Sequence, residues 1–210
     1  MRERRSPTVK KAPSRRMGAK GSDNWHAMLD GAEAILREEG YAALTSRRVA
    51  ERIGVKQRLV YYYFHTMDDL VVQTFRRLSV RELERLRLAQ ASDSPLREIW
   101  NVAIHTTDAR LISEFMALAG RVDTLRAEVV TFIEESRRIQ VEVLSRSVVS
   151  RAAGSIPPVA TAIIATSLAL TLLRETSIGV TTGHVMVRQV IDDHMKKLEA
   201  ARSGSRLRRA

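Results

Sequence analysis

The sequence contains no cysteine among its 210 residues. This absence excludes disulfide bonds, a thiolate metal site and a cysteine nucleophile, and it is consistent with the reducing cytoplasm. The segment MRERRSPTVKKAPSRR at the start lacks the apolar stretch of a secretory signal. We therefore expect a cytoplasmic protein that folds around an apolar core, and this length is enough for one or two domains.

The sequence also lacks the usual motifs of enzymatic sites. Its histidines are His26, His65, His105, His184 and His194. None has a glutamate three positions before it, which excludes the Glu-x-x-His pattern of di-iron bundles. No Gly-rich phosphate loop and no Gly-x-Ser-x-Gly elbow is present. Asp192, Asp193 and His194 are adjacent, but neighbours on a helix point apart, so we expect no metal, no cofactor and no catalysis. An all-α enzyme is the alternative, which a bound metal or turnover would reveal.

Acidic residues are scarce at both ends of the chain. Residues 1–21 hold eight basic residues and one acidic residue, and residues 202–210 hold four basic residues and no acidic one, so these segments carry the whole net charge of +11. Because the first segment also combines prolines and glycines with few apolar residues, we expect a basic disordered arm there and a basic tail at 202–210. The arm either improves solubility or lies along phosphates or in a minor groove. Positive potential at the ends would steer the chain to a nucleic acid.

Apolar residues at helical spacing predict two short helices in residues 45–70, TSRRVAERIGVKQRLVYYYFHTMDDL. The first helix ends at Ile53, because Gly54 suits the left-handed conformation that follows a helix. After a tight turn, the second helix spans Gln57 to Phe64. Two short helices around a glycine turn are typical of a helix-turn-helix, whose second helix enters the DNA major groove. An ordinary helical hairpin is the alternative.

The side chains of the second helix distinguish these alternatives. The helix is predicted to bury Val60 and Phe64 and to expose Gln57, Arg58, Tyr61 and Tyr62. Tyr61, Tyr62 and Tyr63 are consecutive, and neighbours on a helix point about 100° apart, so at least one hydroxyl must face outward. Five basic residues and one acidic residue lie between positions 41 and 66. This surplus of positive charge favours nucleic-acid binding.

Five short segments carry a resemblance to a known family: Thr45, Val49-Ala50, Gly54-Val55, Val60 to Phe64, and Asp68 to Leu70. Together they resemble the DNA-binding signature of the TetR family of bacterial one-component transcriptional regulators. The resemblance covers Trp25 to Leu70. It implies a homodimer that binds a palindromic operator in double-stranded DNA, and a C-terminal domain that encloses a small-molecule effector.

The resemblance also implies roles for single residues. Bases would meet Gln57, Arg58 and Leu59. Phosphates or base edges would meet Tyr61, Tyr62 and Tyr63. The DNA backbone would meet Thr45, Ser46 and Arg47, at the start of the preceding helix.

Two positions depart from the family pattern. Lys56 stands where the family usually has a capping serine, so the second helix lacks a side-chain acceptor for its free N–H groups, and a DNA phosphate could take that place. Met67 stands where the family usually has a phosphate-binding lysine. The loss of that contact should lower the slope of log affinity against log salt by about one.

The rest of the pattern predicts helices only. Ser22 or Asp23 begins a helix that ends at Gly40 and completes a three-helix DNA-binding domain at 22–68. Thr66 and Asp69 are typical of a capping box, which begins a long helix to about Ala89. Further helices are expected at 95–106, where Ser94 could cap and Pro95 suits the first turn, and at 108–119, 122–150, 157–178 and 184–200. The expected fold is all-α with about nine helices, and residues 69–201 form the ligand-binding and dimerisation domain.

Residues 152–173 contain no charged side chain, and such a length could span a bilayer. Serines, threonines and two prolines within it favour instead a helix that is covered by its own chain and by a partner. An apolar stripe on the last helix is formed by Val187, Val190, Ile191, His194, Met195 and Leu198. The resemblance implies that these two helices from each subunit form a four-helix dimer interface. We expect no membrane span.

The resemblance also places an effector site on the middle helices, at Trp100, His105, Phe115, Met116 and Phe132. Because these faces carry few polar residues, the effector should be largely apolar and held by one or two hydrogen bonds. Simple core packing is the alternative for each residue.

Together these observations predict a homodimeric repressor that a largely apolar small molecule releases from its operator. The effector would favour a conformation of the body that moves the two recognition helices away from half-site spacing. The alternative is a sequence-tolerant nucleoid or RNA-binding protein driven by its basic tails. Retention of one DNA fragment against random DNA distinguishes the two.

Overall fold

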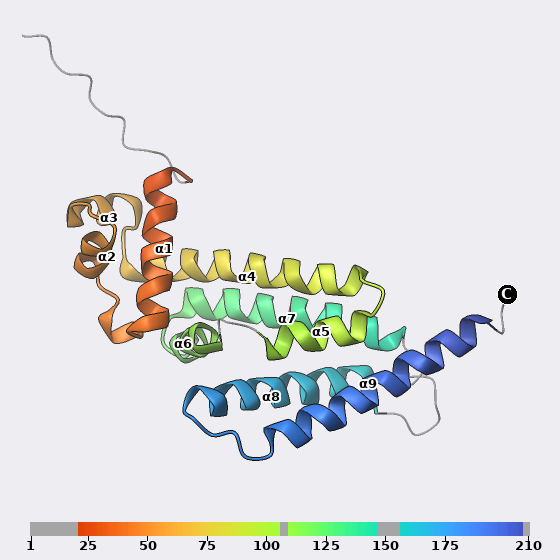
Figure 1. The fold of residues 1–210 in the computed structure, drawn as a ribbon. Coiled ribbons are helices and arrows are strands. Elements are labelled where there is room, and N and C mark those ends of the chain that lie inside the picture. The colour runs from red at the N-terminus through yellow and green to blue at the C-terminus, as the bar shows by residue number, and fades with distance from the viewer. Residues whose placement is uncertain (1–20, 106–108, 147–155, 208–210) are drawn as a thin grey trace, which may run out of the picture.

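The computed structural model describes residues 21–105, 109–146 and 156–207 (Figure 1). The elements are α1 (Asp23–Glu38), the 3-10 turn η1 (Tyr41–Ala43), α2 (Ser46–Arg52), α3 (Gln57–Tyr63), α4 (Met67–Ala91), α5 (Pro95–Ile104), α6 (Ala109–Ala119), α7 (Asp123–Ser145), α8 (Pro158–Ser177) and α9 (His184–Leu207). Within those described ranges there is no strand, which confirms the predicted all-α fold.

Local signals determine where the first helices begin and end. The Ser22 hydroxyl accepts a hydrogen bond from the Trp25 N–H at 3.4 Å and caps α1. Gly40 follows α1 with a φ of 81°, which a side chain would strain. The predicted capping box of α4 is confirmed, because Thr66 and Asp69 exchange side-chain-to-backbone hydrogen bonds of 3.0 Å.

The predicted start of α5 is confirmed, but the predicted end of the last helix was wrong. Ser94 stands at the N-cap of α5 and Pro95, which has no N–H to satisfy, is its first residue, although the Ser94 side chain makes no capping hydrogen bond. The last helix continues to Leu207, so most of the predicted 202–210 tail is helical. Residues 1–20 of the predicted arm, the end of the predicted 122–150 helix and residues 208–210 lie outside the described residues.

The helices form a head and a body (Figure 1). The head consists of α1, η1, α2 and α3, and α4 runs from it into the body. There α4 packs against α5 and α7, which in turn pack against α8. The helix α9 lies beside α8 and contacts α5. The long helix that was predicted to link head and body therefore does so.

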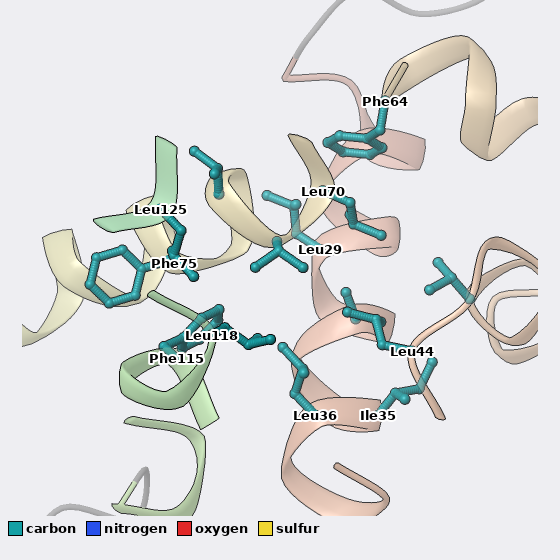
Figure 2. Packing of buried hydrophobic residues seen from close by; sticks show 14 of the residues in the cluster. Leu29, Ile35, Leu36, Leu44, Phe64, Leu70, Phe75, Phe115, Leu118 and Leu125 are labelled. Carbon is teal, nitrogen blue, oxygen red and sulfur yellow. The ribbon is translucent and has the colours of Figure 1, made fainter. Parts of the chain in front are cut away.

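A single apolar cluster, the first core, joins the head to the body. Figure 2 shows Leu36 of α1 and Phe115 of α6 pointing into it together with Leu70 and Phe75 of α4. The Phe75 ring lies edge-on to the Phe115 ring, with centroids 5.1 Å apart. Burial of one such side chain stabilises the fold by about 1.5–3 kcal/mol. The domain boundary predicted near residue 68 lies inside this shared core, so the head is packed onto α4 rather than connected by a linker.

An ion cluster also connects α1 to α4. Glu33 is buried on α1, and it accepts hydrogen bonds from Arg37 of its own helix and from Arg77 and Arg81 of α4 at 2.8 to 3.0 Å. Burial alone would raise the pKa of Glu33, but the hydrogen bonds from Arg81, Arg37 and Arg77 lower that pKa to about 2. The charged carboxylate therefore fixes α1 against α4.

A second core lies at the far end of the body. It contains Trp100 and Ile104 of α5 with Ala169 and Leu172 of α8. From α9, the residues Val187, Ile191 and Met195 pack against it. Val190 and His194 of the predicted α9 stripe are exposed instead, so this stripe divides into an inward and an outward face.

The helix α8 has two contrasting faces. Ala162, Ala169 and Leu172 are buried against the body, whereas Val159, Ile163 and Leu170 are exposed. Among the described helices, α8 alone is long and apolar enough to cross a membrane, with a mean hydropathy of 1.3 over its best window. Length and composition alone are weak evidence for a span, because a core helix passes the same test.

Candidate nucleic-acid interface and ligand cavity

Local geometry forms the predicted helix-turn-helix. Thr45 caps α2 by accepting a hydrogen bond from the Arg48 N–H at 3.1 Å. After α2 ends, Gly54 adopts a φ of 69°, a conformation that a residue with a Cβ would find strained. Lys56 stands at the N-cap of α3 without a side-chain capping bond, as the sequence predicted. The first N–H groups of α3 are therefore left without a side-chain acceptor at that cap.

The side chains of α3 divide between core and solvent as predicted. Val60 and the following Phe64 are buried, and Leu59 is half-buried against the first core. On the other side, Tyr61 and Tyr62 are each 49% exposed, and Gln57 and Arg58 are exposed as well. This leaves a polar and aromatic surface on the outer side of a short helix.

Hydrogen bonds order part of this surface. The buried Ser46 hydroxyl donates to the Tyr61 hydroxyl at 3.0 Å and accepts from Gln57 Nε2 at 2.8 Å. The Tyr63 hydroxyl lies 2.9 Å from the Ser22 hydroxyl, which ties α3 to the cap of α1. Ser46 thus positions two side chains of α3, a role that the sequence did not indicate. Its direct contact with a DNA backbone stays a prediction.

Three arginines of the motif have acidic partners. Arg48 contacts Glu39 at 2.8 Å, and its hydrogen bond lowers the pKa of that carboxyl. Arg52 pairs with Glu38 at 2.7 Å and with Glu39 at 3.5 Å. Glu38 and Glu39 lie at the C-terminal end of α1, outside the segment 41–66 in which the charges were counted. That count therefore overstated the unpaired positive charge of the motif.

The third of these ion pairs, between Arg47 and Glu51, is exposed to solvent. Arg47, one of the predicted backbone contacts, pairs with Glu51 at 2.8 Å, and both side chains are at least half exposed. Exposed pairs of this kind contribute little to stability, so a phosphate can replace the glutamate readily. Within the described part of the chain, Lys56 and Arg58 form no ion pair. Unpaired positive charge is therefore concentrated at the N-terminal end of α3.

A comparison with family models identifies this motif. Residues 28–74 match the model described as "Bacterial regulatory proteins, tetR family". In this DNA-binding domain the chain therefore matches the TetR family. The match extends from α1 into α4 and so includes the whole helix-turn-helix. No curated protein matches the sequence.

Solved structures show that the TetR-like fold extends through the body. A TetR transcription regulator from Haloarcula marismortui aligns with a TM-score of 0.69 at 17% identity, over 82% of this chain and 96% of that one. A putative transcriptional regulator from Saccharomonospora viridis in complex with choline gives 0.67 at 14% identity, over 84% and 93%. The SmeT–triclosan complex, whose SmeT is a repressor from Stenotrophomonas maltophilia, gives 0.54 at 20% identity, over 73% and 80%. At these identities the likeness concerns the fold.

The predicted effector residues do not gather at one place. Trp100 lines a cavity of about 60 Å³ between α5, α7, α8 and α9. Phe115, Met116 and Phe132 belong to the first core or pack against it, where the rings of Phe115 and Phe132 contact Phe75 of α4. His105 is exposed at the end of α5, where its Nδ1 lies 3.2 Å from the Asn101 carbonyl oxygen.

Most of the residues that line this cavity were not predicted from the sequence as ligand residues. Gln140 of α7 and Thr166 of α8 line the cavity and hydrogen-bond to each other at 3.2 Å, and Met195 of α9 lines it as well. The helical pattern of the sequence does not distinguish these three residues from their neighbours. Only the packing of α5, α7, α8 and α9 brings them together. No charged side chain of a described residue lines this cavity.

A larger and more open groove of about 380 Å³ lies where the head meets α6. Glu39, Glu114 and Arg121 line it, and the Tyr41 N–H donates to Glu114 across it at 3.4 Å. Its charged lining does not match the apolar effector that the sequence predicts.

In the described ranges no group of three His, Asp or Glu side chains could hold a metal ion. Asp193, one of the adjacent residues considered as a metal ligand, lies 3.5 Å from Lys196.

Proposed function

We propose that this protein is a ligand-responsive transcriptional regulator, a homodimer that represses from a palindromic operator and is released by a largely apolar small molecule. The observation that carries the proposal is the exposed surface of α3. Its outward side chains and the unpaired charge of Lys56 and Arg58 lie at the end of the helix that a helix-turn-helix inserts into the major groove.

In this proposal the recognition helix α3 contacts DNA along its whole length. Gln57, Arg58 and Leu59 face the bases, and an arginine there can donate two hydrogen bonds to a guanine. Tyr61, Tyr62 and Tyr63 meet phosphates or base edges, while Thr45, Ser46 and Arg47 meet the backbone beside α2. A phosphate near Lys56 would accept from the uncapped N–H groups of α3. Phosphate contacts then set the register, and base contacts set the sequence.

The outward faces of α8 and α9 support a dimer. Val159, Ile163 and Leu170 recur at helical spacing on α8, and Met186 and Val190 do so on α9; all are exposed. Several exposed apolar side chains on two neighbouring helices favour an interface with another chain. Two copies meeting there would form a four-helix contact with two-fold symmetry, which would match a palindromic operator.

The effector would act through helices that surround the cavity at Trp100. α5 and α7 both line that cavity and both pack against α4. α4 contributes no residue to its lining, so the signal would pass from α5 and α7 to α4 and then to the head through the shared first core. A differential affinity of about 1–3 kcal/mol between the two conformations would suffice for regulation. The choline and triclosan complexes of similar folds support ligand binding in such a body.

Competition between DNA fragments tests this proposal against the sequence-tolerant alternative. DNA flanking the gene of this protein is labelled, bound, and challenged with excess random DNA. A regulator should retain its operator fragment against at least about a thousandfold excess of random sites. Equal displacement by random DNA would support instead a nucleoid or RNA-associated role driven by the basic ends.

A further inference from the structure

Trp100 carries a buried hydrogen-bond donor that lacks an acceptor. Its side chain is 3% exposed in the second core, and its Nε1 has no hydrogen-bond partner in the described structure. An indole N–H can only donate. Buried tryptophans usually satisfy this group, so the exception requires an explanation.

The lining of the cavity restricts what could satisfy this donor. Thr166 donates to Gln140, Thr161 donates to the Pro157 carbonyl oxygen, and neither these residues nor the alanines around them accept from Trp100 Nε1. Without a charged side chain in the described lining, the cavity offers nothing to neutralise an ionic ligand. Burial of an unpaired charge there would be strongly unfavourable. The chemistry of the site therefore favours a neutral molecule.

The cavity is small at about 60 Å³ and partly open to solvent. An engineered apolar cavity of about 150 Å³ holds benzene, so a ring-sized ligand would have to widen this one or extend out of it. Met195 closes one side from α9, and a methionine has three rotatable bonds that allow it to move aside. Displacement of Met195 would also disturb the contact of α9 with the second core.

We propose that the effector is a neutral, largely apolar molecule with one oxygen acceptor, and that this oxygen accepts a hydrogen bond from Trp100 Nε1. The inference rests on the proposed function and specifies the ligand class of the same regulator. The apolar part of the molecule fills the cavity among the alanines and Met195. The oxygen supplies the acceptor that the free protein lacks, so it determines both orientation and selectivity.

Two molecules of the same shape test this proposal. Acetophenone has a carbonyl oxygen where α-methylstyrene has a CH2 group. Each is titrated into the full-length ¹⁵N-labelled protein, and the indole N–H signals of Trp25 and Trp100 are followed by NMR. Acetophenone should shift the Trp100 signal, leave the Trp25 signal in place, and bind about fivefold more tightly than the hydrocarbon.

Matched variants identify the donor. Trp100→Phe keeps an aromatic ring but removes the N–H, so both molecules should bind it equally. Trp25→Phe changes the other tryptophan, which lies in the head, and should preserve the preference. Equal binding of the pair to the wild type, an unmoved Trp100 signal, or a preference that survives in Trp100→Phe would each overturn the inference. Absence of binding by either molecule in calorimetry would also overturn it.

Operator retention by the ligand-free protein is measured on the same preparations. Because retention depends on α3 and not on the cavity, a protein that retains its operator but fails the acetophenone test contradicts only the ligand assignment. A protein that passes the acetophenone test but shows no preference for any DNA fragment contradicts the regulator proposal.

Discussion

Arg77 of α4 donates a hydrogen bond from its Nη2 to Oε2 of Glu33 on α1, at 2.9 Å. Arg81, one turn further along α4, reaches the other oxygen of the same carboxylate at 3.0 Å. The acceptor is only 7% exposed, so these charge-assisted bonds are shielded from competing water. They join the first helix of the head to the helix that enters the body, and α1 in turn packs against α2, which packs against α3.

Glu33→Gln should loosen that junction. The substitution keeps the shape of the side chain but removes the charge that three arginines share, and we expect a loss of about 2 kcal/mol in the free energy of unfolding. Urea unfolding measures it. Glu134→Gln is the matched control, because Glu134 is exposed and pairs with Arg137 at 3.5 Å; it should change stability by less than about 0.5 kcal/mol. Equal effects of the two substitutions would contradict the role of Glu33.

The same carboxylate should make stability depend on acid pH. Its pKa is lowered from 4.5 to about 2 by the arginines, against the effect of burial. A group with a depressed pKa in the folded state stabilises the protein fully above its unfolded value, and it loses this contribution as pH falls from about 4.5 towards 2. The wild type should therefore lose more stability than Glu33→Gln between pH 6 and pH 3 in urea titrations. Parallel losses in both proteins would show that Glu33 is not responsible.

Arg58→Ala should weaken specific DNA binding. The side chain is exposed at the N-terminal end of α3 and has no acidic partner among the described residues, so its loss should reduce operator affinity by about 10- to 100-fold. Arg138→Ala removes the same charge from the exposed surface of α7 and should leave affinity within about twofold. Fluorescence anisotropy on the retained operator fragment compares them. If both variants bind alike, α3 is not the reading helix.

Val190→Lys should dissociate the dimer. Val190 is 68% exposed on the outward face of α9, and two symmetric lysines there would bury unpaired charge in the proposed interface. We expect dimerisation to weaken on the order of a hundredfold in sedimentation velocity. Val80→Lys is the control, since Val80 is 67% exposed on α4, away from that face. A monomeric wild type, or equal dissociation of both variants, would contradict the interface.

The sequence predicted the head well because its signals are local. A cap at Ser22, a glycine at position 54 and a capping box at Thr66 act within a few residues, and the inward positions of Val60 and Phe64 follow from helical spacing alone. The pattern gives the face of a helix but not the partner that the face meets. The contact of Glu33 with Arg77 joins distant parts of the chain, so no spacing rule could reveal it.

The candidate ligand site shows the same limit. Trp100 and Phe115 both follow the apolar pattern of middle helices, yet they belong to different cores, because Trp100 packs with Ala169 and Leu172 of α8 whereas Phe115 packs with Phe75 of α4. Gln140 and Met195 reach the cavity only through the packing of four helices. Ser94 occupies the N-cap of α5 as predicted, but its side chain makes no hydrogen bond to the turn that Pro95 begins.

Footprinting on the DNA that flanks the gene of this protein tests the central claim most directly. If two copies present α3 to adjacent major grooves, the wild type should protect two half-sites related by a two-fold axis, with centres about 34–36 Å or a multiple of that distance apart. Arg58→Ala should lose this protection at the same protein concentration. Uniform protection without a repeated half-site, or a symmetric footprint that Arg58→Ala leaves unchanged, would contradict the assignment of α3 as the DNA-reading helix.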